Sequence, residues 1–300
     1  MANTDTGVAQ GGLGITIAAA IVQFNKAAVT PQTISMAAAL KGSHSVTFPL
    51  YTKLAVSTVT NEGADDEDTE VAATSITTTA KNIEILRNHI NARVTDLAVH
   101  GNTDALLVNA GQVLGNAVAA EFDNNICARY DPFATSKGTS SDGLKFLDIM
   151  DAVASLESND APRPYSAVLH PLQMYGSYGL SNEFGSTAVQ GSNAAFHGMG
   201  GTKVEDQFMN AGFVTSLAGI NFYTSPQVAD GSDSTEKKGG IYTKTALGCG
   251  YMDFGGGNFI EIRTERNELG ASTNIVCNGY WASDELVDLH GVEIFTEISG

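Results

Sequence analysis

A long helix-forming stretch that follows a β-rich segment is the feature that most constrains how this chain can fold. Asn102, Thr103 and Asp104 suit a helix N-cap and first turn, and apolar residues then recur at helical spacing to about Tyr130. Pro132 ends the pattern. At 1.5 Å per residue, a helix over 103–130 would be roughly 40 Å long. Such a helix suits a strut across a flat subunit.

The segment before this helix predicts a long β-hairpin. Residues 45–56 and 71–79 are rich in β-branched and alternating apolar positions, and residues 61–68 between them are polar and acidic. An isolated two-stranded hairpin is marginal in water, so one this long should dock on something, and a neighbouring subunit is the obvious candidate. Residues 83–98 predict a strand first and a helix later.

The first 44 residues predict an arm that needs another surface to lie on. Residues 1–40 are rich in Ala, Gly, Gln and Thr, and Pro31 divides two short helix-capable pieces. The apolar run 13–24 lacks a preceding basic residue and is too short to span a bilayer. We therefore expect an amphipathic arm, with no signal peptide and no membrane contact.

The second half begins with a Ser/Gly/Thr stretch, 135–143, which predicts a domain boundary. A second helix is expected over 144–157. Its predicted apolar side consists of Phe146, Leu147, Met150, Val153 and Leu156. A short buried strand, 165–170, follows, and Pro171 suits the first position of the next helix.

The last third is predicted to be mostly strand. Residues 213–228 suggest two strands joined by a turn at Gly219, and the polar residues 230–240 suggest a surface loop. Further strands are expected over three ranges, 259–265, 275–280 and 292–298. In the first of these, Glu261, Arg263 and Glu265 share one face, which is expected to be exposed.

The charge balance favours a protein that works through its surfaces. Only 16% of the residues are charged, against a usual share of about 25%. One explanation is that much of the exterior is buried against other copies. The net charge of −17 argues against gripping nucleic acid through its phosphates, although an acidic wall could still enclose DNA. It also predicts salt-sensitive assembly.

Enzymatic and metal-binding patterns give no residues to support them. Cys127, Cys249 and Cys277 are far apart and odd in number, which disfavours a disulfide framework or zinc site and suits a reducing cytoplasm. Asp253-Phe254-Gly255 resembles a kinase metal-binding triplet, but no phosphate loop accompanies it. His170 and the other histidines show no ligand spacing, so structural or exposed roles are expected. We expect no enzyme activity, no cofactor and no metal.

The acidic residues of the hairpin tip leave one alternative open. Asp66, Asp68 and Glu70 alternate, as calcium ligands can, although the turn glycine and ordered spacing of a calcium loop are missing. A solvated loop, or one that meets a basic patch on a neighbour, fits better. A calcium-dependent, β-rich binding module remains the alternative.

The order of these pieces resembles the Hong Kong 97-type capsid fold of tailed-bacteriophage major capsid proteins, across nearly the whole chain. The resemblance rests on the arm and on motifs in this order: Phe48-Pro49, Glu62-Gly63-Ala64, the helix 103–130, Val168-Leu169-His170-Pro171, Gly219-Ile220, Ser225-Pro226, 259–262 and 292–298.

The resemblance implies an α+β subunit of four parts. Residues 1–44 would be the N-terminal arm and 45–80 an extended loop (E-loop). A peripheral domain with the long spine helix would comprise 81–134 and 251–288, and an axial domain 135–250 and 289–300. The E-loop would lie over a neighbour. Residues expected at contacts between subunits are Ile21, Phe24, Phe48, Pro49, Glu62, Gly63, Asp65, Asp66 and Asp68.

The function implied is that of a major capsid protein, made in the bacterial cytoplasm and located in the virion. Its copies would form hexamers and pentamers of an icosahedral shell around double-stranded DNA, which they would not bind sequence-specifically. Portal, scaffolding and decoration proteins would be partners. An encapsulin-like compartment shares the fold and is a second alternative. No motif supports covalent crosslinking of Lys53 to an asparagine.

Overall fold

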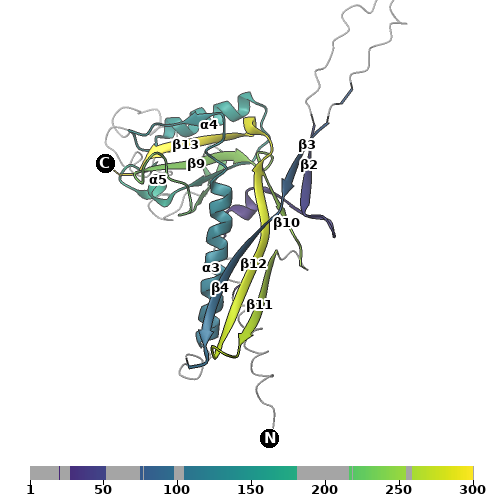
Figure 1. Cartoon of the computed structure of the whole chain (residues 1–300). Helices are drawn as coiled ribbons and strands as arrows, with labels where there is room; N and C mark the ends of the chain where they lie inside the picture. Colours follow the sequence, from purple (N-terminus) through teal and green to yellow (C-terminus); the bar gives the residue numbers. More distant parts are fainter. Residues whose placement is uncertain are drawn as a thin grey trace, which may run out of the picture.

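A computed structural model describes residues 20, 28–51, 75–76, 78–97, 105–180, 216–217, 219–254 and 259–299. These residues form two multi-stranded sheets and a separate two-stranded hairpin. An elongated half contains the long helix α3 (Ala105–Cys127) and the first sheet, and a rounder half contains the second sheet (Figure 1). The described structure is therefore of mixed α+β class.

The first sheet is built around β12 (Ser272–Glu285). Strand β4 (Leu86–Thr95) pairs with it antiparallel over ten residue pairs, from Ser272 with Thr95 to Trp281 with Leu86. Strand β11 (Ile260–Asn267) pairs with the first part of β12 and β10 (Leu247–Tyr251) with its end. Strand β1 (Ser35–Ala38) runs parallel to β10. Because paired residues share a face, alternate positions give this sheet one apolar and one polar side.

Helix α3 packs on the apolar side of the first sheet. Its buried residues Leu114, Val118, Phe122 and Ile126 recur every four positions, which places them in one stripe. The stripe shares a hydrophobic cluster with residues of β12, including Trp281. The Trp281 ring centroid lies 5.5 Å from that of Phe122. This packing fixes the long helix along the sheet.

The second sheet carries the rounder half. Its strands, in spatial order, are β5 (Ser136–Lys137), β13 (Gly291–Glu297), β9 (Glu236–Thr243), β6 (Tyr165–Leu169), β8 (Ile220–Thr224) and β7 (Ser216–Leu217). Helix α4 (Phe146–Ser158) contributes buried residues, including Ile149 and Leu156, to the cluster that also contains Leu169 and Ile294. Every residue of β6 is buried. The buried strand predicted over 165–170 is therefore confirmed.

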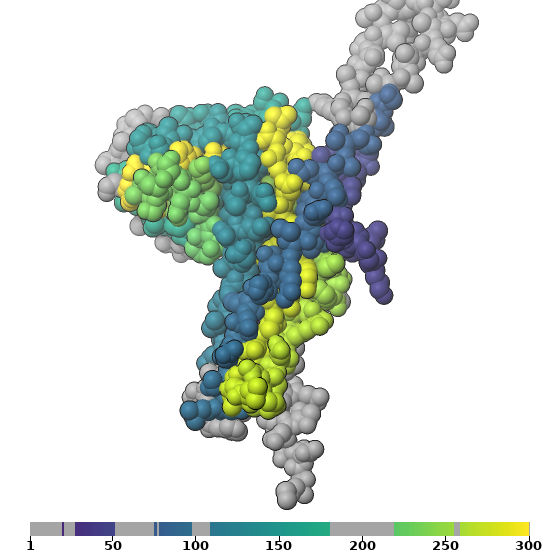
Figure 2. All heavy atoms as spheres, in the orientation of Figure 1, coloured from purple at the N-terminus to yellow at the C-terminus, as the bar shows by residue number. Residues whose placement is uncertain are grey.

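The hairpin consists of β2 (Ser45–Tyr51) and β3 (Thr78–Glu84), paired antiparallel. Figure 2 shows its strands standing out from the body on the right. The base of the predicted hairpin is therefore confirmed, and its second strand continues to Glu84. Its acidic segment, residues 61–68, lies outside the described residues.

Several predicted elements are confirmed. Helix α3 covers the predicted stretch up to Cys127, and its expected cap residues at 102–104 lie outside the described residues. Helix α4 covers 146–158. Pro171 is the first residue of α5 (Pro171–Tyr175), and His170 is its N-cap. Gly219 has a φ of +79° between β7 and β8, which only glycine adopts easily.

The expected change from strand to helix within residues 83–98 comes later than predicted, because only residues 96–97 are helical. Strand β4 continues without interruption to Thr95. All ten of its residues pair with β12, so sheet pairing outweighs the local helical preference of the second half.

The expected surface loop over 230–240 is wrong at its end, because β9 begins at Glu236. Gly239 and Gly240 are buried strand residues. A Cβ atom on Gly240 would lie 2.8 Å from the ring of Tyr130, and one on Gly239 would lie 2.7 Å from Leu169. The two glycines serve close packing here, not a turn.

The expected apolar side of the second helix is only partly right. Leu147 is 66% exposed and Met150 is 38% exposed, whereas Val153 and Leu156 are buried as expected. The buried stripe consists of Ile149, Ala152, Val153 and Leu156. Helix α4 is apolar on two sides, and the sheet covers only one of them.

Candidate interaction surfaces

The base of the hairpin is anchored to the first sheet. Val46 and Ile83 are paired in register, and both are buried. Val46 lies against Gly250 of β10, where an added Cβ would come within 3.1 Å of it. Lys81 Nζ on β3 lies 3.0 Å from Asp284 Oδ2 on β12. These contacts fix the direction in which the hairpin leaves the body.

The outer part of the hairpin exposes apolar side chains. Tyr51 is 69% exposed at the end of β2, and Ile76, just before β3, is 63% exposed. Of the residues predicted at subunit contacts, Phe48 is half-buried and Pro49 is exposed opposite Ala80. A proline, which has no N–H, suits a strand that pairs on one side only.

The other residues predicted at contacts are not placed. Ile21, Phe24, Glu62, Gly63, Asp65, Asp66 and Asp68 lie outside the described residues. The structure therefore brings together only Phe48 and Pro49 of that set.

A second exposed apolar surface lies on α5 and the turn after it. Leu172, Tyr175 and Tyr178 are 45%, 44% and 39% exposed. Sequence reasoning missed this surface, and its only signal is the spacing of three between these residues. Apolar side chains gathered on a surface indicate contact with another molecule.

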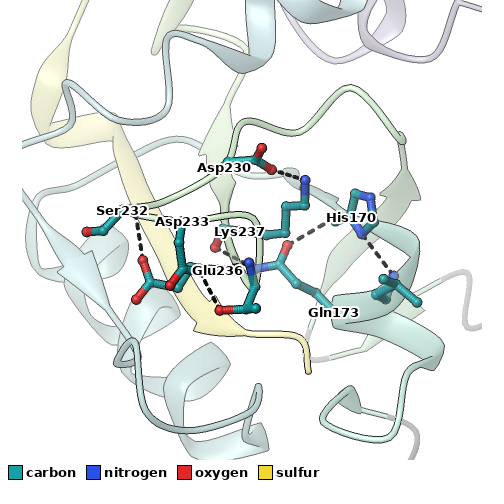
Figure 3. Close-up of polar contacts among 9 residues, drawn as sticks. His170, Gln173, Asp230, Ser232, Asp233, Glu236 and Lys237 are labelled. Atoms are coloured by element: carbon teal, nitrogen blue, oxygen red, sulfur yellow. Dashed lines mark hydrogen bonds and ion pairs between the residues drawn. The ribbon is translucent and has the colours of Figure 1, made fainter. Parts of the chain in front are cut away.

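A buried glutamine fixes α5 to the second sheet. Gln173 is fully buried, and its Nε2 donates to Thr296 Oγ1 at 2.8 Å and to the Lys237 carbonyl oxygen at 3.0 Å. Its Oε1 accepts from the His170 backbone N–H at 3.0 Å. His170 Nδ1 accepts from the Leu172 N–H at 3.2 Å, as a helix N-cap does (Figure 3). The exposed side of α5 is thus held rigidly.

The neighbouring loop closes on itself through carboxylates. Glu236 Oε2 accepts from the Ser232 N–H at 2.6 Å, and Asp233 accepts from the hydroxyl of Thr235. Asp230 pairs with Lys237 (Figure 3). Burial and, to a smaller extent, the charge of Lys237 lower the pKa of His170 from its ordinary value. His170 is therefore neutral in its capping role, which confirms the structural role expected for it.

The polar side of the first sheet is exposed and carries arginines. Arg263 pairs with Glu261 on its own strand at 2.6 Å, and Arg87 Nε donates to Asn278 Oδ1 across strands at 3.0 Å. A shallow pocket of about 390 Å³ lies among these residues. Of the face predicted to be exposed, Arg263 and Glu265 are exposed and Glu261 is half-buried.

The three cysteines are buried and free. Burial raises the thiol pKa of Cys127 and Cys249 to about 12 and that of Cys277 to about 11. Such thiols are poor nucleophiles at neutral pH. Among the described residues, no group of three His, Cys, Asp or Glu side chains is placed to hold a metal ion.

Within the described ranges, none of the helices has the length and apolar character needed to cross a membrane.

Comparisons with known proteins identify the fold. The chain matches a capsid protein of Ralstonia phage GP4 with a TM-score of 0.64 and 12% identity, over 89% of this chain and 87% of that one. It matches a capsid protein of cyanophage P-SCSP1u with a TM-score of 0.60 and 16% identity, over 89% and 86%. An encapsulin complex from Synechococcus elongatus matches with a TM-score of 0.56 and 9% identity, over 90% and 87%.

No family model and no curated protein sequence matches the chain. The similarity is therefore one of fold: the chain has the fold that tailed-phage capsid proteins and encapsulins share.

Proposed function

We propose that this chain is the major capsid protein of a tailed bacteriophage and that its copies assemble into a closed shell. The observation that carries this proposal is the match to several phage capsid proteins over more than four fifths of both chains. The projecting hairpin and the exposed apolar residues on α4 and α5 support it, because a lone subunit gains nothing from such surfaces.

The proposed domains follow the sheets. Sheet one with α3, the proposed spine helix, would be the peripheral domain, and sheet two with α4 and α5 the axial domain. Strand β10 pairs with β12, so the boundary that fits the strands best lies in the turn 244–246, shortly before residue 250. The hairpin 45–80 would be the E-loop. Within the proposed arm 1–44, β1 pairs with β10, so its last part belongs to the body.

In this proposal the shell is built from hexamers and pentamers and encloses double-stranded DNA in the virion. The net charge of −17 supports an inner wall that leaves DNA unbound. Portal, scaffolding and decoration proteins would be further partners. Each contact between subunits can be weak, because every copy makes several of them at once.

Electron microscopy of the purified protein at low and moderate salt tests the proposal. We expect uniform closed shells or capsomer rings, with better assembly at moderate salt because the acidic subunits repel one another less. Deleting residues 61–68 should leave a folded subunit that forms no closed shells. A protein that stays monomeric even with the scaffolding and portal proteins of its own genome would refute the proposal.

An encapsulin-like compartment is the second candidate, because an encapsulin is among the similar structures. The contents of native particles separate the two: nuclease-protected DNA indicates a phage head, and an enclosed enzyme indicates a compartment. The acidic segment on which the calcium-binding alternative rests lies outside the described residues, so that alternative keeps only its sequence argument.

A further inference from the structure

A carboxylate is buried where the N-terminal part of the chain joins the body. Asp123 on α3 is 3% exposed. Its oxygens accept from the backbone N–H of Val29 at 3.1 Å and of Thr30 at 3.1 Å, and from Thr30 Oγ1 at 2.6 Å. Ser225, which follows β8, donates a longer bond of 3.5 Å. One side chain thus joins three parts of the molecule. Residues 28–33, here called the exit segment, are the first of these parts.

The exit segment is held in two separate ways. Its first half, at Val29 and Thr30, bonds to the Asp123 carboxylate. Its second half is held elsewhere: Thr33 Oγ1 lies 2.7 Å from the hydroxyl of Tyr242 on β9. Strand β1 follows directly and pairs with β10. Thr33 also donates from its N–H and its Oγ1 to the Thr30 carbonyl oxygen, at 2.9 and 2.8 Å, so release of the first half would open this turn while β1 stays paired.

The carboxylate depends on the exit segment for its partners. Burial raises the pKa of Asp123, and the donors of Thr30 and Val29 oppose this effect. An ionised carboxylate that loses its donors while buried is strongly destabilised. If the exit segment leaves, water can reach the carboxylate and replace those donors. The carboxylate therefore has hydrogen-bond donors both when the exit segment is bound and when it is released. An apolar residue at this position would be stable only while the exit segment covers it.

We infer that Asp123 is a latch that fixes where and in which direction the N-terminal arm leaves the subunit. The latch positions the arm, and the Thr33 and β1 contacts keep a released arm attached. The role of the latch in assembly rests on the proposed capsid function. Its action within one subunit does not depend on that function.

Hydrogen exchange of the isolated subunit tests the latch directly, because two backbone amides, those of Val29 and Thr30, donate to Asp123. In Asp123→Asn the charge is lost, and the new NH₂ faces the Val29 N–H in either orientation because that N–H donates to both carboxylate oxygens. Val29 and Thr30 should therefore exchange about ten- to a hundredfold faster. The amides of β1 should keep their wild-type rates. Thr30→Val removes only the hydroxyl bond and should give a smaller acceleration at the same two amides. Asp131→Asn is the matched control, because Asp131 pairs with Lys238 and does not contact the exit segment.

Two results would overturn the latch. One is unchanged exchange at Val29 and Thr30 in both variants. The other is equal acceleration in the exit segment, β1 and α3, since Asp123 would then be an ordinary core residue. Particle yield by electron microscopy tests the assembly role: Asp123→Asn should lower the yield of closed shells and Asp131→Asn should not. Normal shells from a variant with a released exit segment would refute that role. A wild type that forms no shells while the exchange result holds would refute the capsid function and leave the latch standing.

Discussion

The single tryptophan of the chain lies over a glycine, and this contact makes a sharp prediction about how α3 is held. A Cβ atom on Gly279 would lie 1.7 Å from a ring carbon of Trp281, two residues further along β12. Real Cβ atoms are never so close to another atom, so Gly279→Ala must displace the indole ring. Trp281 is 2% exposed and packs between α3 and the sheet. Its displacement disturbs the core on which the long helix rests.

The expected cost follows from the contacts that the ring makes. The centroid of Trp281 lies 5.5 Å from that of Phe122 and 5.7 Å from that of Phe259. Each such aromatic pair is worth about 0.5–1.5 kcal/mol beyond buried area. Overpacking a core costs about 1–3 kcal/mol more. We therefore expect Gly279→Ala to lower the free energy of unfolding by about 2–6 kcal/mol.

Chemical unfolding followed by circular dichroism measures this loss, and tryptophan emission reports the ring itself, because the chain has one tryptophan. We expect a lower midpoint and a red-shifted emission maximum in Gly279→Ala. Gly270→Ala is the matched control on the turn before β12, where the nearest atoms belong to the side chain of Asn267, which can move. If Gly279→Ala keeps the wild-type midpoint and emission, the packing of Trp281 on Gly279 is wrong.

Two further predictions concern α5. Gln173→Leu should cost about 2–4 kcal/mol in chemical unfolding, because it leaves the hydroxyl of Thr296 and the N–H of His170 buried without their partner. A wild-type midpoint would contradict the hydrogen bonds of Gln173. The lowered pKa of His170 means that the folded state favours neutral imidazole, so its stabilising effect is complete above about pH 6.5 and is lost as the pH falls. His170→Asn, which caps without titrating, should lose less stability between pH 7 and pH 5 than the wild type, in thermal unfolding at each pH. An equal loss in both would contradict the capping argument.

Local sequence patterns predicted those elements whose form depends only on neighbouring residues. The buried positions Leu114 and Val118 on α3 need only the helical repeat, and Pro171 needs only its preference for the first helical position. Gly239 and Gly240 suggested a loop because glycine usually marks one. Gly240 instead packs on the ring of Tyr130 and Gly239 on Leu169, residues 110 and 70 positions away in sequence. No local pattern carries that information.

The surfaces were harder to predict than the fold. The spacing of Leu172, Tyr175 and Tyr178 is equally suited to a core, and only the position of the second sheet shows that these residues are exposed. Asp123 is buried on α3, next to Phe122. From the sequence alone, a single acidic residue in such a helix gives no sign that it is buried or what it binds. Its partners at residues 29 and 30 precede it by more than 90 positions. Burial and partners, which make a residue functional, come from the tertiary structure.

The exposed apolar side of α4, part of which was predicted to be buried, allows a test of assembly. Leu147 and Met150 project from its outer side, where they are 66% and 38% exposed. Changing both to Gln should alter the stability of the subunit by no more than about 0.5 kcal/mol, as for other surface positions. If this side is buried between copies, each lost apolar contact should cost about 1–2 kcal/mol per subunit.

That cost would raise the protein concentration needed for shells roughly tenfold or more, since about 1.4 kcal/mol corresponds to a factor of ten. Sedimentation across a concentration series measures this threshold. Asp151→Asn, an exposed polar position on the same helix, is the control and should leave the threshold unchanged. A double variant that assembles at the wild-type concentration would show that the outer side of α4 faces solvent in the shell. The apolar residues there would then have no part in holding copies together.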